Sequence, residues 1–148
     1  MPTKRTPQKT RRRNSVAVQI AATGAPSAAL LRRYARSAAR ADVTVRVVGA
    51  TEGRRLNKTF RKRNTPTNVL SFPYGGGRGD VVLCHPVIAK EARAQRKTLR
   101  AHYAHLVVHG VLHLRGHDHR RKREAARMER IEVRVLRSLG FDDPYAVK

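Results

Sequence analysis

The sequence predicts an α+β (mixed α/β) fold, in which a small mixed sheet of about four strands packs against about five helices. Two observations predict it. Short β-branched segments alternate with helix-like segments in the first half of the chain, and the sequence beyond Pro86 is helical in character to its end. A length of 148 residues suits one domain with one core. We expect that domain to span residues 15–148, after a disordered basic arm over residues 1–14.

Four segments have the character of strands, and the clearest is Val43–Val48, which alternates and is rich in β-branched residues. The four are residues 15–20, 43–48, 68–72 and 80–84. The last is apolar enough to be central in the sheet. Pro73 is expected to close the third strand, and the glycine-rich residues 74–79 are expected to form a flexible turn.

Five segments have the character of helices: residues 26–39, 52–62, 87–98, 99–114 and 120–138. The fourth is apolar nearly all round, which is typical of a buried helix. In the fifth, Met128, Ile131 and Val135 recur at helical spacing, and Gly140 supplies a stop signal.

The composition is strongly basic, with 33 Lys and Arg against 10 Asp and Glu, a formal net charge of +23. A polyanion is the simplest partner for such a chain, and a nucleic-acid backbone is the first candidate; a generally cationic surface is the alternative. Cys84 is the only cysteine, which indicates a reducing compartment, and we expect a cytoplasmic protein. No apolar run approaches the 18 or so residues of a membrane span.

The segment His109-Gly-Val-Leu-His113-Leu-Arg-Gly-His117-Asp-His119 carries the chemistry. Two histidines four residues apart share one face of a helix and can reach a single metal ion. Gly116 can end the helix in a left-handed turn and let His119 approach as a third ligand. Three imidazoles on a tetrahedral zinc leave one position for water, which is typical of a catalytic site.

The ligand set remains open at this point, because His105 and His109 have the same spacing and His117 adjoins His119. A histidine stripe could also be a polar seam in a buried helix. Several buried imidazoles without partners would each cost about 1–3 kcal/mol, however, and a metal ion removes that cost for all of them.

These motifs together resemble the YbeY family of single-strand-specific endoribonucleases. The resemblance covers about residues 43–145 and rests on the histidine segment together with several shorter strings. They are Leu56-Asn57, Phe60-Arg61, Pro66-Thr-Asn-Val-Leu-Ser-Phe-Pro73, Gly79-Asp80-Val-Val82 and Gly140-Phe-Asp-Asp-Pro-Tyr145. The chain departs from the family pattern at His117, where tyrosine is usual, and at Lys62-Arg63-Asn64.

The resemblance implies that His109, His113 and His119 bind one zinc ion in a basic cleft and that Arg61 is catalytic. It implies cleavage of single-stranded RNA in maturation of the 16S rRNA 3′ end and in ribosome quality control, with an rRNA precursor and the ribosome as partners. Zinc and an arginine fork would both stabilise the charge of a phosphoryl transition state.

Further residues are candidates for supporting roles. Four residues are candidates for hydrogen bonding to the metal ligands or for the role of general base: Asp80, Asp118, His117 and His105. Asp80 is otherwise explained by turn chemistry, and Asp118 by capping of the last helix. Lys58, Lys62, Arg63 and Arg115 are candidate RNA contacts, and Phe72 or Tyr74 could stack a base.

Two other functions compete with a nuclease. One is a zinc hydrolase of another substrate such as a peptide, although Gly110 stands where an H-E-x-x-H protease carries its glutamate base. The other is a non-catalytic RNA- or ribosome-binding factor that contains zinc.

Overall fold

A computed structural model describes residues 15–61, 67–117 and 121–146, with the side chains of Phe60 and Arg61 excepted. It contains a four-stranded mixed sheet and five helices, so the predicted α+β class is confirmed. The elements in chain order are β1 (Val16–Ile20), α1 (Ala28–Ala38), β2 (Val43–Val48), α2 (Ala50–Arg61), β3 (Val69–Gly75), β4 (Arg78–Cys84), α3 (His85–Ala94), α4 (Leu99–Leu114) and α5 (Lys122–Ser138). The predicted basic arm lies outside the described residues.

The sheet has the order β1-β2-β4-β3, with β1, β2 and β4 parallel and β3 antiparallel to β4. The apolar strand β4 is internal, as its composition predicts. Its residues Val81 and Leu83 face the main core, whereas Val82 faces a smaller cluster on the other side. Alternate side chains of one strand therefore serve two different cores.

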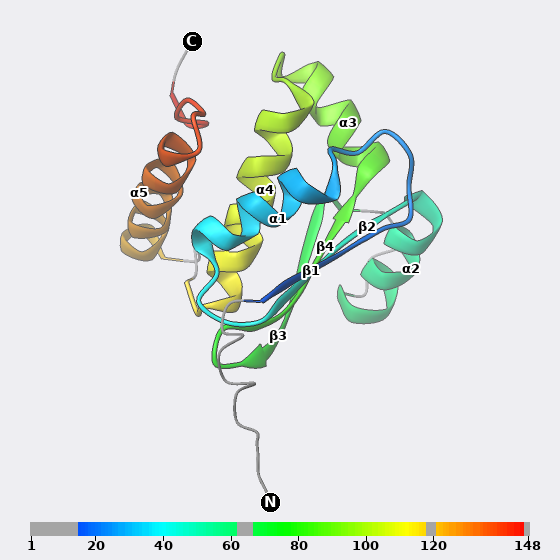
Figure 1. The fold of residues 1–148 in the computed structure, drawn as a ribbon, viewed down its shortest axis with the longest axis horizontal. Coiled ribbons are helices and arrows are strands. Elements are labelled where there is room, and N and C mark those ends of the chain that lie inside the picture. Colours follow the sequence, from blue (N-terminus) through cyan, green and yellow to red (C-terminus); the bar gives the residue numbers. More distant parts are fainter. Residues whose placement is uncertain (1–14, 62–66, 118–120, 147–148) are drawn as a thin grey trace, which may run out of the picture.

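The helices divide unequally between the two faces of the sheet (Figure 1). Helices α1 and α4 lie on one face and share the main core with it, and α5 packs on the side of α4 that is away from the strands. Helix α2 covers the opposite face, where Leu56 packs near Leu70 and Val82. No helix in the described part of the chain is both long and apolar enough to cross a membrane.

Helix α4 forms over the predicted residues because both of its ends carry local signals. The Thr98 side chain accepts a hydrogen bond from the backbone N–H of Ala101, which caps the first turn. At the other end Gly116 has φ +95°, and the N–H of His117 donates to the carbonyl of Leu112 at 3.0 Å. This arrangement is a Schellman motif, so the predicted left-handed turn at Gly116 is confirmed.

The predicted boundaries of the hairpin between β3 and β4 are wrong. The hairpin turn is tighter than residues 74–79, because β3 continues through Gly75 and β4 begins at Arg78. Gly75, Gly76 and Gly77 all have positive φ and allow the sharp reversal. Pro73 does not end β3, because β3 is an edge strand in which a missing N–H costs little.

Helix α3 also differs from its prediction over residues 87–98. Pro86 lies in its first turn, where its missing N–H is not needed, so the helix begins two residues early. It ends at Ala94, because Arg96 takes a left-handed conformation (φ 56°) and Thr98 caps α4 instead. Helix α2 begins at Ala50 rather than at residue 52, and α5 begins at Lys122 rather than at residue 120, with Arg121 at its N-cap.

Gly110 marks the point where α4 lies closest to the sheet. A Cβ atom added there would lie 2.7 Å from Cγ1 of Val81 and 3.2 Å from Oγ of Ser71. The Ser71 hydroxyl donates to the Gly110 carbonyl at 3.0 Å, which fixes the contact. This close approach fixes the distance between the sheet and the helix positions of the neighbouring histidines.

We predict that Gly110→Ala destabilises the protein by about 1–3 kcal/mol, because the added methyl group must displace the packed valine. An alanine inside an unobstructed helix would instead stabilise it by up to about 1 kcal/mol. Urea denaturation measures the change. Gly49→Ala is the control, since no atom lies within 4 Å of its Cβ position and its φ is not positive. A Gly110→Ala protein as stable as the wild type would contradict the close packing.

Candidate metal centre

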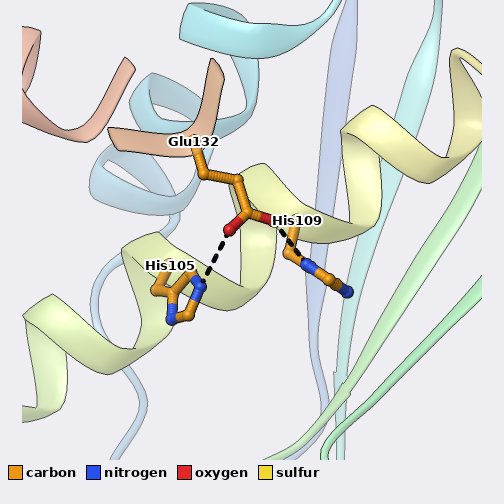
Figure 2. A group of neighbouring side chains, drawn as sticks. All are labelled: His105, His109 and Glu132. Carbon is orange, nitrogen blue, oxygen red and sulfur yellow. Dashed lines mark hydrogen bonds and ion pairs between the residues drawn. The ribbon is translucent and has the colours of Figure 1, made fainter. Parts of the chain in front are cut away.

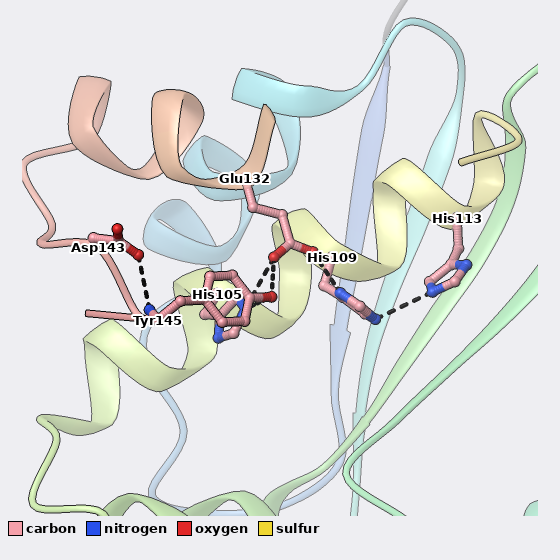
Figure 3. A network of polar contacts seen from close by, with 6 residues as sticks. All are labelled: His105, His109, His113, Glu132, Asp143 and Tyr145. Atoms are coloured by element: carbon pink, nitrogen blue, oxygen red, sulfur yellow. Dashed lines mark hydrogen bonds and ion pairs between the residues drawn. The ribbon is translucent and has the colours of Figure 1, made fainter. Parts of the chain in front are cut away.

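Helix α4 places His105, His109 and His113 one turn apart along one side (Figure 3). The Nε2 atoms of His109 and His113 lie 3.1 Å apart, and the two rings meet nearly edge to face at 74°. Both side chains are half-buried, whereas the helix positions around them are buried. The two imidazoles are therefore partly exposed on a helix whose neighbouring positions are buried.

A buried carboxylate of α5 stands behind these histidines. The side chain of Glu132 has no exposed surface, and its Oε2 lies 2.5 Å from Nδ1 of His109 (Figure 2). Its Oε1 lies 3.2 Å from Nε2 of His105 and also accepts from the hydroxyl of Tyr145. Tyr145 belongs to the segment after α5, and its backbone N–H donates to Asp143 (Figure 3).

These hydrogen bonds keep Glu132 ionised despite its burial. Burial by itself would raise the pKa of this carboxyl, but the hydrogen bonds from His105, His109 and Tyr145 outweigh it and lower the pKa to about 2. Burial, followed by the bond to Glu132, raises the pKa of the Tyr145 phenol, which therefore stays protonated and able to donate.

The ionised carboxylate determines which nitrogen of His109 carries the proton. A carboxylate can only accept, so the facing Nδ1 must be the donor. In the neutral ring the lone pair then lies on Nε2, which faces Nε2 of His113. A carboxylate that binds the far N–H of an imidazole is the usual support of a metal-bound histidine.

Two places in this cluster could be considered for a metal ion. The ligand atoms of His105, His109 and Glu132 lie within 4.8 Å of one another, so this group could hold one. Two nitrogens on the same tetrahedral zinc lie about 3.3 Å apart, given Zn–N distances of about 2.0–2.1 Å. The facing Nε2 atoms, which are hydrogen-bonded at 3.1 Å in this structure, lie close to that spacing. The 2.5 Å between His109 and Glu132 is too short for two ligand atoms of one zinc ion and is a hydrogen-bond distance.

Two further predicted site residues, Arg115 and His117, follow the last residue of α4. His117 follows Gly116, and burial, together with the charges of Arg115 and Arg127, lowers its pKa. Arg115 donates to the carbonyl of Ala38 at 3.2 Å. His119 and Asp118 lie outside the described residues, as do Lys62 and Arg63. Arg61 is the last residue of α2, and nothing is described of its side chain.

The other candidates lie on α2, β3 and β4. Lys58 is exposed on α2. Asp80 lies within β4 rather than in a turn, and its carboxylate accepts a 2.5 Å hydrogen bond from the hydroxyl of Tyr74. Tyr74 is 62% exposed and Phe72 is half-buried beside the smaller core cluster.

Sequence reasoning missed Glu132 and Tyr145 as parts of the site. A signal for Glu132 was available, because it lies four residues after Met128 and four before Leu136, within the buried stripe of α5. A carboxylate at such a position must be paired. The sequence does not reveal that its partners are histidines of another helix.

Known proteins are similar to this chain in sequence and in fold. The sequence model of the family described as Endoribonuclease YbeY matches residues 8–140. A protein named Endoribonuclease YbeY from Aromatoleum aromaticum is 53% identical over 126 residues, covering 82% of both chains. Its namesake from Polynucleobacter asymbioticus is 44% identical over 137 residues, covering 88% of both.

A solved structure has a fold similar to that of this chain. The solution structure of TM1509 from Thermotoga maritima superposes with a TM-score of 0.56 at 25% identity, covering 89% of this chain and 99% of that one. The family match supports an RNA endonuclease activity, and an endoribonuclease implies an RNA substrate. The chain belongs to the YbeY endoribonuclease family.

Proposed function

We propose that this protein is a zinc-dependent, single-strand-specific endoribonuclease that acts in maturation of the 16S rRNA 3′ end and in ribosome quality control. The observation that carries the proposal is the facing pair of Nε2 atoms, one of them oriented by the buried Glu132, in a chain of an endoribonuclease family. Its partners would be single-stranded RNA, an rRNA precursor and the ribosome, and its location the cytoplasm.

His109 and His113 would hold the zinc ion, with His119 as the third ligand. Glu132 would fix the ring of His109 and make it more basic. Bound zinc supplies a Lewis acid for a phosphoryl oxygen and lowers the pKa of a bound water toward about 7. The left-handed turn at Gly116 supports His119 as the third ligand, because the chain reverses there three residues before His119.

Arg61 would hold the phosphate that is cleaved. A guanidinium offers two parallel N–H donors to a phosphate and stays charged at every physiological pH. The cations Lys58, Lys62, Arg63 and Arg115 would neutralise neighbouring phosphates without reading the base sequence. The net charge of +23 supports this role.

Peptide hydrolysis is disfavoured by the packing of Gly110. The residue after the first histidine would have to carry the glutamate base of an H-E-x-x-H protease. At Gly110 even a methyl group would lie 2.7 Å from Val81, so no longer side chain fits at this position without moving α4 away from the sheet.

We predict that His113→Ala abolishes RNA cleavage and lowers the zinc content, because it removes one of the two facing nitrogens. Arg61→Ala should keep zinc and fold but lose at least about 100-fold in turnover, as expected when a charge-stabilising donor is removed. Cleavage of a labelled single-stranded RNA, with casein as the peptide substrate, measures activity; elemental analysis measures zinc.

Arg54→Ala is the matched control for Arg61→Ala, since Arg54 is an exposed arginine of the same helix. Full activity of Arg61→Ala would remove Arg61 from the chemistry. RNA binding without cleavage by the zinc-loaded wild type would favour a non-catalytic RNA-binding factor, and cleavage of casein would favour a protease.

We also predict that Glu132→Gln weakens zinc binding about 10–100-fold, because a neutral amide lacks the negative charge and can donate as well as accept, so it holds the Nδ1–H tautomer of His109 less strongly. Competition with a chromogenic chelator measures the affinity. Glu129→Gln is the control, an exposed carboxyl on the same helix. An unchanged zinc affinity of Glu132→Gln would show that the carboxylate is a structural element only.

A further inference from the structure

The outer face of α5 carries an unbroken row of arginines. They follow one another at intervals of four, three, four and three residues, and all are exposed. The row consists of Arg123, Arg127, Arg130, Arg134 and Arg137. At 3.6 residues per turn these positions fall within an arc of about 80°. We call this row the α5 arginine ridge.

The ridge lies on the face of α5 opposite the one that packs toward α4, and Arg130, Arg134 and Arg137 line a hollow that Asp143 and Tyr145 also line. The opposite face of α5 buries Met128, Glu132 and Leu136, which pack toward α4. Helix α5 lies on the outside of α4, at the edge of the molecule (Figure 1). The two faces of this helix therefore have separate roles: the inner one holds the carboxylate of the metal centre, and the outer one faces solvent.

None of the ridge arginines forms an ion pair within the described part of the chain. No described carboxylate lies within 4.0 Å of any of its guanidinium groups, whereas Arg46 is paired with Glu52 at 2.6 Å. Like charges three and four residues apart disfavour a helix, so the alignment opposes folding rather than assisting it. Solubility would be served equally well by scattered cations. An aligned row is explained by an extended anionic partner.

We propose that the α5 arginine ridge binds the sugar-phosphate backbone of RNA outside the cleavage site. From Arg123 to Arg137 the helix rises about 21 Å, which corresponds to about six phosphates at 3.4 Å each. Arginine is the side chain best suited to bidentate phosphate contacts. The inference rests on the proposed nuclease function for the identity of the polyanion.

The position of the ridge favours a strand that also reaches the metal centre. Glu132 on the inner face bonds His109 directly, and a helix with its side chains is about 10–12 Å thick. A short oligonucleotide would occupy the cleavage site alone, whereas a longer one could contact both. The ridge would thus increase affinity for long substrates without taking part in the chemistry.

A membrane surface fits the ridge less well than RNA. A helix that lies on a bilayer inserts an apolar face beside its cationic one. The apolar face of α5 is already buried against α4. Large exposed apolar side chains in the described residues are Ile20, Tyr74 and Tyr145, and none of them belongs to α5.

The test compares two triple variants of the full chain that lose the same three charges. R123Q/R130Q/R134Q removes three arginines of the ridge and keeps Arg127, whose charge acts on His117. R33Q/R36Q/R93Q removes three exposed arginines of α1 and α3. Fluorescence anisotropy measures binding of 2′-O-methyl oligouridines of 6 and 24 nucleotides between 50 and 200 mM NaCl. Circular dichroism and zinc content verify that both variants remain folded and loaded.

We expect the ridge variant to bind the 24-mer at least about tenfold more weakly at low salt, with a salt slope reduced by about 2, from 0.7 per lost contact. Its binding of the 2′-O-methyl 6-mer, and its cleavage of an unmodified 6-mer of the same sequence, should stay within about twofold of the wild type. The control triple should lose less than about threefold on the 24-mer.

Equal losses in both triples, or unchanged binding of the 24-mer by the ridge variant, would overturn the proposal. The proposal would also be overturned if the ridge variant lost binding to phosphatidylserine vesicles while it retained the RNA binding of the wild type. If the wild type failed to cleave RNA while the ridge variant still lost affinity for the 24-mer, the proposed nuclease function would fail and the ridge would stand as an RNA-binding surface.

Discussion

The candidate site depends on one hydrogen bond, from Nδ1–H of His109 to the buried carboxylate of Glu132. A neutral imidazole without such a partner interconverts between two tautomers, and only one of them presents a lone pair on Nε2. Three donors keep the carboxylate ionised in a place where burial would otherwise neutralise it. The imidazole is therefore oriented before any ligand arrives, which reduces the cost of binding a metal.

The fold supplies this bond by bringing three elements together around α4. The sheet holds α4 at a fixed depth through the close contact between Gly110 and Val81. On the other side of α4, Glu132 of helix α5 accepts a hydrogen bond from His109. Tyr145, in the segment after α5, donates a hydrogen bond to the same carboxylate. The C-terminal segment is thus bonded to the metal centre although it lies 36 residues from His109 in sequence.

Local signals made much of the fold predictable. Strand β2 and helix α4 have the predicted bounds residue for residue, because a β-branched run and a capped apolar run each define their own ends. The histidine pair followed from helical spacing. The hairpin boundaries were predicted wrongly because a proline is tolerated in an edge strand, and the sequence does not show that β3 lies at the edge of the sheet. Glu132 was missed because its partners are set by the packing of α5 on α4, which no local pattern encodes.

The central claim is that His109 donates through Nδ1 to Glu132 and presents Nε2 to a metal shared with His113. Long-range proton–nitrogen NMR of the histidine rings, recorded before and after zinc is added, tests it most directly. The account predicts that Nδ1 of His109 is protonated both before and after zinc is added. In the rings of His109 and His113, zinc should shift the 15N resonances of the Nε2 atoms and not those of the Nδ1 atoms. Loss of the Nδ1 proton with a metal shift at that atom, accompanied by a shift at His105, would contradict it, because the ion would then lie at Glu132.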